Sequence, residues 1–160
     1  MKTLVAYYSR TGNTKKVGEA LAEKINADIE AIESNTKDKG MANLAMQAFM
    51  RVHAKIGATK KDAASYDLVV IGSPVWAGKM SSPIRTYLAK NKNKFTGVAF
   101  FCTHGNPDSE GSVKMLESME SFSGKKAAAV LDVAAGDVES GAYVEKVKRF
   151  ADALLEYPSS

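Results

Sequence analysis

A hydroxyl-rich loop stands near the start of the chain, between an apolar run and an amphipathic segment. Its residues are Ser9, Arg10, Thr11, Gly12, Asn13 and Thr14. Three hydroxyls and one side-chain amide supply hydrogen-bond donors, and no residue of the loop is acidic. A helix that begins here would add unpaired backbone N–H groups and the partial positive charge of its N-terminus. This combination is typical of a site that holds a phosphate group.

Two later segments also combine turn residues with groups that could contact a ligand. Residues 72–80 contain an aromatic side chain, Trp76, together with one proline and two glycines, and residues 103–107 contain His104 beside a glycine and a proline. Each segment directly follows an apolar run. Glycine and proline at such spacing predict loops.

The elements that position these loops are predicted from apolar patterning. Apolar runs predict strands over residues 3–8, 28–33, 68–72, 98–103 and 127–133. The runs at 68–71 and 98–101 are continuous rather than alternating, which is typical of parallel strands buried on both faces. With helices in the gaps, the pattern predicts a doubly wound α/β fold around a five-stranded parallel sheet. Ligands in this architecture bind beyond the carboxyl ends of the strands, where the three loops would lie side by side.

Apolar stripes at helical spacing fill the gaps between the strands. Ser82 as N-cap and Pro83 in the first turn predict the start of the third helix. For Met46, Met50 and His53 the default interpretation is core packing, and the alternative is a Met-lined cover over the ligand. The five stripes are Val17, Ala20, Leu21 and Ile25; Ala45, Ala48, Phe49, Val52 and Ile56; Ile84, Tyr87 and Leu88; Met115, Leu116, Met119 and Phe122; and Tyr143, Val147, Phe150, Ala151 and Leu154.

Composition narrows the class of protein. The 160 residues, 45% hydrophobic and 25% charged, predict one globular domain over residues 1–160. We expect neither a leader peptide nor a membrane segment, because the chain begins directly with a predicted strand and no apolar run approaches about 20 residues. A lone cysteine is typical of a reducing cytoplasm, and one Cys with two His predicts no metal site. The net charge of +4 is spread over lysine pairs, which favours an acidic protein partner over nucleic acid.

Two phosphate-handling classes that use related folds fail on single positions. A receiver domain needs carboxylates at the end of the first strand, where this chain has Tyr7, Tyr8 and Ser9. A cysteine phosphatase needs arginine six positions after its nucleophile, and the residue at that spacing from Cys102 is Asp108.

The loop motifs resemble those of the flavodoxin family. Tyr8-Ser9-Arg10-Thr11-Gly12-Asn13-Thr14 is similar to the flavodoxin phosphate loop, and Ser73-Pro74-Val75-Trp76-Ala77-Gly78 is similar to its second, isoalloxazine-side loop. The order of predicted elements and the chain length extend the resemblance to the whole chain. It implies a flavodoxin-like sheet with strand order 2-1-3-4-5, in the short-chain group because no long insertion interrupts the last strand.

The resemblance implies FMN as cofactor, no metal and no catalytic side chain. Phosphate contacts would come from the side chains of Ser9, Thr11, Asn13 and Thr14 and from the backbone N–H groups of Arg10 and Gly12. Trp76 would stack on the ring, and the backbone from Pro74 through Val75 to Gly78 would run along its edge. A carbonyl near Ala77 or Gly78 would accept from the reduced ring, and Lys79 would flank the site. The pyrimidine side and ribityl chain would meet Thr103, His104, Gly105 and Asn106.

Each of these assignments has a purely structural alternative. The first loop could only cap a helix, and Trp76 could be a core aromatic. For His104 the two interpretations, a flavin contact and a loop histidine without a role in binding, are equally favoured. Cys102 is interpreted as a small hydrophobic residue at the end of a strand.

The chain departs from acidic electron-carrier flavodoxins around the flavin. Basic Arg10 and Lys79 flank the site, and His104 stands where a second stacking tyrosine is expected. Positive surroundings favour an anionic reduced flavin, so we expect a second reduction at a less negative potential than in those proteins.

The resemblance leaves the use of the flavin open. The favoured function is a cytoplasmic electron carrier, a monomer or weak dimer that docks with redox partner proteins. The alternative is an FMN enzyme that passes electrons from a nicotinamide donor to a quinone-like acceptor, although the chain has no Gly-x-Gly-x-x-Gly motif. A third reading is an interaction module without cofactor.

Overall fold

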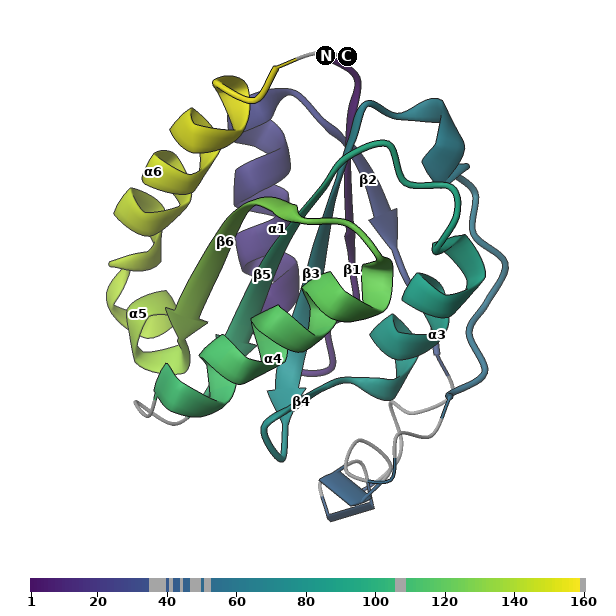
Figure 1. Ribbon diagram of the computed structural model, residues 1–160. Coiled ribbons are helices and arrows are strands. Elements are labelled where there is room, and N and C mark those ends of the chain that lie inside the picture. Colours follow the sequence, from purple (N-terminus) through teal and green to yellow (C-terminus); the bar gives the residue numbers. More distant parts are fainter. Residues whose placement is uncertain are drawn as a thin grey trace.

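A parallel sheet forms the centre of the protein in the computed structural model, which describes residues 1–34, 40, 42–43, 45–46, 50, 53–105 and 109–158. Its strands run in the order β2-β1-β3-β5-β6, and a further short strand, β4, pairs antiparallel with β3. Figure 1 shows the parallel strands pointing in one direction, so that their carboxyl ends meet at one rim. The strands are β1 (Thr3–Tyr7), β2 (Asp28–Ala31), β3 (Leu68–Trp76), β4 (Lys79–Met80), β5 (Val98–His104) and β6 (Ala127–Ala134).

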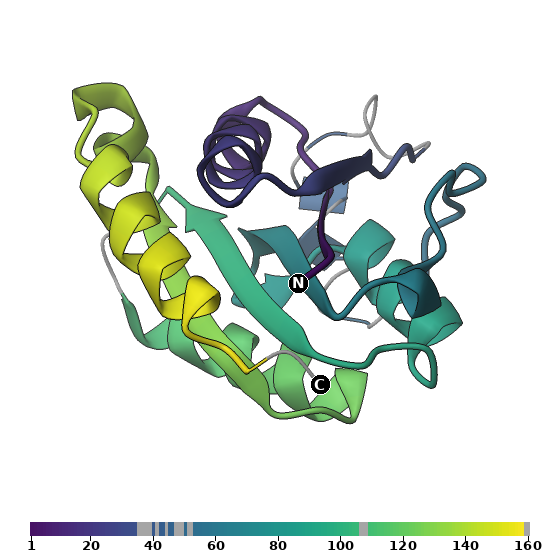
Figure 2. The same ribbon diagram turned by 90° about the horizontal axis from the view of Figure 1, so that it is seen from above.

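Helices cover both faces of the sheet. Helices α1 (Asn13–Ile25), α5 (Ala135–Ser140) and α6 (Tyr143–Leu155) pack on one face. Helices α3 (Ser82–Asn91) and α4 (Ser109–Ser123) pack on the other, and a single 3-10 turn, η1 (Ala63–Ser65), precedes β3. Figure 2 shows the sheet between the two layers, with α1 in purple and α6 in yellow on the same side. Because β3 and β5 are covered on both sides, their continuous apolar runs are fully buried.

The predicted fold class is confirmed, with one addition. Counted without β4, the observed order is the expected 2-1-3-4-5. The added strand arises because β3 does not end at Gly72, as predicted, but continues to Trp76 and then turns back. The extension is supported by β5, whose register with β3 continues to the pair Pro74 and Thr103.

The N-cap of the third helix lies one residue before the predicted one. Ser81 is the N-cap and Ser82 is already helical, with Pro83 in the first turn. The backbone N–H of Ser81 donates to Ser73 Oγ at 2.9 Å, and the Ser73 hydroxyl donates to Ser81 Oγ at 3.1 Å. This buried serine pair joins the start of α3 to β3 and fixes the boundary at Ser81.

The predicted second helix is supported in its first part, where Ala45 and Met46 are helical and the N–H of Met50 donates to the carbonyl of Met46 at 2.9 Å, but it does not extend to Ile56. Ile56 forms an isolated antiparallel bridge with Ser34 and is therefore extended rather than helical. Core packing was the wrong interpretation for Met46 and Met50, which are 62% and 66% exposed, and His53 is exposed as well. Ile56, at the end of the predicted stripe, is buried in the core. Ala48, Phe49 and Val52 lie outside the described residues.

Within the described part of the chain, no helix combines the length and apolar character needed to cross a bilayer.

Candidate functional site

The first loop leads into α1 through a left-handed glycine. Gly12 is the N-cap residue and has φ of 107°, a conformation that favours glycine. The first bond of the helix runs from the N–H of Lys16 to the carbonyl of Gly12 at 2.9 Å, so the three preceding amides have no partner within the helix. No acidic side chain lies in the first turn. The start of α1 therefore presents unpaired amides and a partial positive charge to an anion.

Two residues of the loop, Ser9 and Gly12, are hydrogen-bonded to each other. The N–H of Gly12 donates to Ser9 Oγ at 3.1 Å. Ser9 and Gly12 thus close the loop on itself, and neither lines the cavity described below. Because Ser9 Oγ only accepts in this bond, its O–H can still donate, and the expected contact of Ser9 with a phosphate stays a prediction.

A buried pair of hydroxyls ties this loop to the neighbouring strand end. Thr14 Oγ1 lies 2.7 Å from Thr103 Oγ1, and both side chains are buried. This hydrogen bond connects the first turn of α1 with the end of β5, between residues that are 89 positions apart in the sequence. It holds the two walls of the site at a fixed separation.

The loops enclose a cavity of about 270 Å³ at the carboxyl ends of β1, β3 and β5. This volume is near the lower end of small-molecule sites. Of the predicted residues, Ala77, Gly78 and Lys79 do not line it, and Asn106 lies outside the described residues. The lining residues are Arg10, Thr11, Asn13, Thr14, Pro74, Val75, Trp76, Thr103, His104, Gly105 and Ala135. Three segments far apart in sequence therefore converge on one hollow, as their positions after parallel strands predict.

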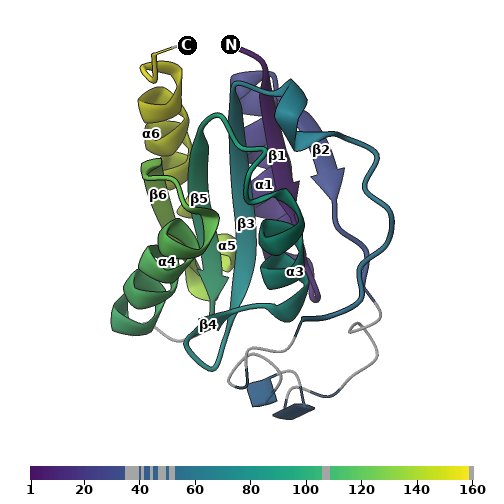
Figure 3. The same cartoon turned by 45° about the vertical axis from the view of Figure 1, so that its right-hand side comes forward.

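The second loop is a tight β-hairpin rather than an open loop. Trp76 pairs with Lys79, and the two residues between them both have positive φ, 49° at Ala77 and 70° at Gly78. Two consecutive left-handed residues are the signature of a type I′ turn. Figure 3 shows this hairpin, with β4, at the rim where the parallel strands end. The hairpin carries Lys79 away from the cavity lining, and it holds Ala77 in a conformation that costs a non-glycine residue about 1 kcal/mol.

Trp76 is a core residue that also forms part of the cavity wall. Its side chain is only 2% exposed, and its ring meets that of Tyr8 edge to face, with 5.7 Å between centroids. β3 continues through Trp76 and places the ring against Tyr8, so little of the indole is exposed for the predicted stacking on the flavin ring. Burial fixes the ring and makes it a rigid boundary of the cavity.

The cavity lining has a clear electrostatic sign. Arg10 and His104 are the ionisable residues among the described residues that line it, and none of these is acidic. Behind His104, the carboxylate of Asp132 on β6 lies 2.5 Å from its Nε2 atom. The Cys102 thiol also donates to that carboxylate, at 3.5 Å. Burial raises the pKa of Cys102, so its sulfur stays protonated and is a poor nucleophile.

Three residues near the site escaped sequence reasoning: Asp132, Ala135 and Asp137. Ala135 lines the cavity, and Asp137 accepts from the N–H of Ala134 at 3.2 Å and pairs with Lys146 at 2.7 Å. The hydrogen bond from Lys146 lowers the pKa of Asp137. Strand register could have revealed Asp132, because β6 places it beside Cys102.

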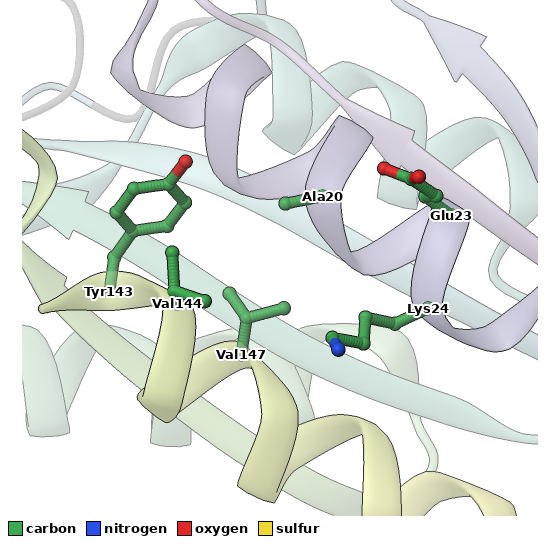
Figure 4. Close-up of a pocket in the computed structure, with 6 residues that line it drawn as sticks. All are labelled: Ala20, Glu23, Lys24, Tyr143, Val144 and Val147. Carbon is green, nitrogen blue, oxygen red and sulfur yellow. The ribbon is translucent and has the colours of Figure 1, made fainter. Parts of the chain in front are cut away.

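A larger hollow, of about 530 Å³, lies between α1 and α6 and has a different character. Figure 4 shows Tyr143, Val144 and Val147 of α6 facing Ala20 and Lys24 of α1. Its lining contains none of the predicted ligand-binding residues. It lies along the sides of two helices rather than at the strand ends, so the smaller cavity is the candidate site.

Comparison with known proteins adds independent information. A segment of 89 residues is 33% identical to an NAD(P)H dehydrogenase (quinone) of Cupriavidus metallidurans, covering 54% of this chain and 45% of that protein. The chain thus spans less than half the length of this curated relative. A flavoprotein of Lactobacillus acidophilus, solved in complex with FMN, is 27% identical with a TM-score of 0.66 over 89% of this chain and 97% of that one.

The fold and the family follow from two further matches. Oxidised flavodoxin 2 of Bacillus cereus superposes with a TM-score of 0.64 over 98% of this chain and 99% of that one. At 18% sequence identity, this match shows a shared fold alone. A family model described as flavodoxin matches residues 2–147, which is most of the chain. This protein belongs to the flavodoxin family.

Proposed function

We propose that the chain, as one domain, binds FMN in the cavity at the start of α1 and carries electrons between redox partner proteins through it. The observation that carries the proposal is the donor set of the cavity. It combines Arg10, Thr11 and Asn13 with first-turn amides of α1 that have no partner within the helix, and none of the described residues that line the cavity is acidic. A terminal phosphate fits this set in both charge and hydrogen-bonding capacity.

The residues divide the work of holding such a cofactor. Thr11, Asn13 and the α1 amides bind the phosphate, and the Thr14–Thr103 bond keeps the cradle in register with β5. Pro74, Val75 and Trp76 supply an apolar wall for the ring system. When bound, FMN supplies one- and two-electron transfer, which the side chains of the cavity cannot perform themselves.

A second function has a specific observation in its favour. The Cupriavidus relative is an NAD(P)H dehydrogenase that acts on quinone. On that basis the alternative is an FMN-dependent oxidoreductase that passes electrons from a nicotinamide donor to a quinone-like acceptor. The match covers only part of both proteins, and for this reason we favour the carrier.

One assay separates the two functions. FMN-loaded protein is mixed with NADPH and benzoquinone, with and without a flavodoxin reductase. A carrier turns over only when the reductase is present, whereas an oxidoreductase turns over without it. Sustained turnover on NADPH alone would overturn the carrier proposal and establish the alternative.

The charge of the site also predicts its redox behaviour. Arg10 lines the cavity and Lys79 lies in the adjoining hairpin, so the reduced anionic flavin is stabilised relative to a site ringed by carboxylates. The second reduction should therefore occur at a less negative potential than in acidic flavodoxins. A spectroelectrochemical titration checks this, and a potential as negative as theirs would contradict it.

A further inference from the structure

A second polar hollow lies between the end of α3 and the segment of residues 56–59. It measures about 440 Å³, against about 270 Å³ for the candidate FMN cavity, and none of the described residues lines both. Figure 3 shows the two segments side by side, although they are far apart in the sequence. The lining residues are Ile56, Gly57, Ala58, Thr59, Lys90, Asn91 and Lys94.

This hollow lies between two lysine-rich segments. Residues 55–61 and 90–94 together contain six lysines and no acidic residue, whereas the net charge of the whole chain is +4. Lys90 and Lys94 line the hollow itself. Of the six lysines, only Lys61 and Lys94 form an ion pair with another described residue. An anion in the hollow would therefore meet ammonium groups that are not already neutralised.

The carboxylates around the hollow leave this positive charge in excess. Asp62 lies 3.8 Å from Lys94, but both side chains are at least half exposed, so the pair is weak and screened by salt. Glu30 is buried and accepts two backbone N–H groups of the adjoining loop, at 2.9 and 2.7 Å. Glu33 lies beside Gly57, and it is the carboxylate that opposes an anion here.

Neutral hydrogen-bond donors stand beside the lysines. The backbone N–H groups of Ala58 and Thr59 and the Thr59 hydroxyl have no hydrogen-bond partner among the described residues. Both residues are exposed. Ammonium groups, backbone N–H groups and hydroxyls are the donors that phosphate oxygens accept from.

The end of α3 carries a partial negative charge, which on its own disfavours an anion. Two carbonyl groups at this end are already hydrogen-bonded. Asn91 Nδ2 donates to the carbonyl of Tyr87 at 2.9 Å, and the N–H of Lys94 donates to the carbonyl of Asn91 at 2.8 Å. These bonds reduce the negative charge that the helix presents, so the lysines determine the sign of the hollow.

We propose that this hollow binds a small anion with two linked phosphate groups, held by Lys90 and Lys94 of one segment and by Ala58 and Thr59 of the other. Two ammonium groups, and a volume larger than that of the FMN cavity, match a diphosphate better than a single phosphate. A diphosphate exists free and as part of a nucleotide, and the test separates these sources. The proposal does not rest on the binding of FMN, because the two sites are built from different residues.

Calorimetric titration with inorganic pyrophosphate, on protein loaded with one FMN per chain, measures the affinity of the hollow. Lys90→Gln combined with Lys94→Gln should weaken binding at least about tenfold, because both charged partners are lost. Lys114→Gln combined with Lys148→Gln is the matched control. It removes the same charge from exposed ion pairs of α4 and α6, and it should change the affinity less than about twofold. Equal losses in the two double variants would show attraction to net charge alone and would overturn the proposal.

Two further measurements do not need the lysine variants. In amide NMR spectra of the unmodified protein, pyrophosphate should shift the signals of Ala58 and Thr59, whereas shifts confined to residues 9–14 would place the anion in the FMN cavity and overturn the proposal. Glu33→Gln should tighten pyrophosphate binding about twofold, and weaker binding would contradict the role given to charge.

ADP distinguishes the two sources of a diphosphate. The loss in K90Q/K94Q should be the same for ADP as for pyrophosphate, because both present linked phosphates to the two lysines. If ADP binds at least as tightly as pyrophosphate, the ligand is a nucleotide, and if it binds more weakly, the ligand is a free diphosphate. An ADP affinity that is unchanged in K90Q/K94Q would overturn the proposal for the nucleotide.

Discussion

The phosphate-type loop of residues 9–14 and the hairpin of residues 73–81 lie on the same rim of the sheet but are built in opposite ways. Thr11 and Asn13 of the loop line the cavity, and the first amides of α1 have no partner within the helix. The hairpin buries its largest side chain, Trp76, against Tyr8 and closes with two residues of positive φ. The loop presents hydrogen-bond donors to the cavity, whereas the hairpin packs its side chains against the core. The affinity for the ligand should therefore depend on the loop, whereas the shape of the cavity should depend on the hairpin and its base.

The largest expected effect comes from removing the donors of the loop. Thr11→Ala combined with Asn13→Ala should weaken FMN binding by a few hundredfold, about 3 kcal/mol, because charged phosphate oxygens lose their partners. Fluorescence quenching measures the change.

Thr59→Ala provides the control for this pair of substitutions, because Thr59 is exposed and lines a different hollow, beside Lys90 and Lys94. The T59A affinity should match that of the unmodified protein. If the double variant also bound normally, the loop would not be the phosphate site.

The next effect tests the base of the hairpin. A Cβ atom added at Gly72 would lie 2.0 Å from Phe101 Cζ, inside the ring of the neighbouring strand. Gly72→Ala should therefore lower the free energy of unfolding by about 3 kcal/mol, measured by urea denaturation. Gly136→Ala is the control, because a Cβ there meets no atom within 4 Å, and its change should stay below about 1 kcal/mol. Equal stabilities of the two variants would show that packing at β3 and β5 does not constrain the hairpin.

These cases also separate what sequence could predict from what it could not. The parallel sheet follows from continuous apolar runs such as residues 68–71 and 98–101, whose burial on both faces has no other simple explanation. The first loop follows from local chemistry, since Gly12 and the helix that it precedes are adjacent in sequence. Both predictions rest on neighbouring residues in the sequence, and the structure contains both the sheet and the loop.

The hairpin and the acidic partner of His104 depend on distant contacts and were missed. The residues around Trp76 do not predict that β5 pairs with β3 as far as Pro74, or that the indole ring packs against Tyr8. Asp132 meets His104 only because β6 lies beside β5 in a particular register. Met46 and Met50 were likewise predicted to pack in the core, but both side chains are exposed. In each of these cases the position of a residue in the folded protein differs from what the local sequence pattern predicts, because contacts between distant segments determine it.

A smaller effect tests how the loop is fastened to the sheet. Thr103→Val leaves the buried Thr14 hydroxyl without its partner and should cost about 1–2 kcal/mol of unfolding free energy. Adding Thr14→Val should restore part of that loss, because neither buried position then carries an unsatisfied hydroxyl. Urea denaturation of the two single variants and the double variant forms a complete cycle. Strict additivity would mean that the hydroxyl pair does not couple α1 to β5.

The smallest effect concerns the turn of the hairpin. Ala77→Asn creates the Asn-Gly dipeptide that type I′ turns favour, at a position with φ of 49°. The variant should gain about 0.5 kcal/mol in thermal or urea unfolding, with FMN affinity unchanged because Ala77 does not line the cavity. A loss of affinity would place this turn among the binding elements and would erase the contrast between the two regions.

The most direct test of the account compares FMN with riboflavin, which has the same ring and ribityl chain but no phosphate. Calorimetric titration of the purified protein should give one FMN per chain, bound at least a hundredfold more tightly than riboflavin, because the donors of Thr11, Asn13 and the α1 terminus meet only the phosphate. Equal affinities for the two flavins would contradict the assignment of the cavity as a phosphate-holding flavin site.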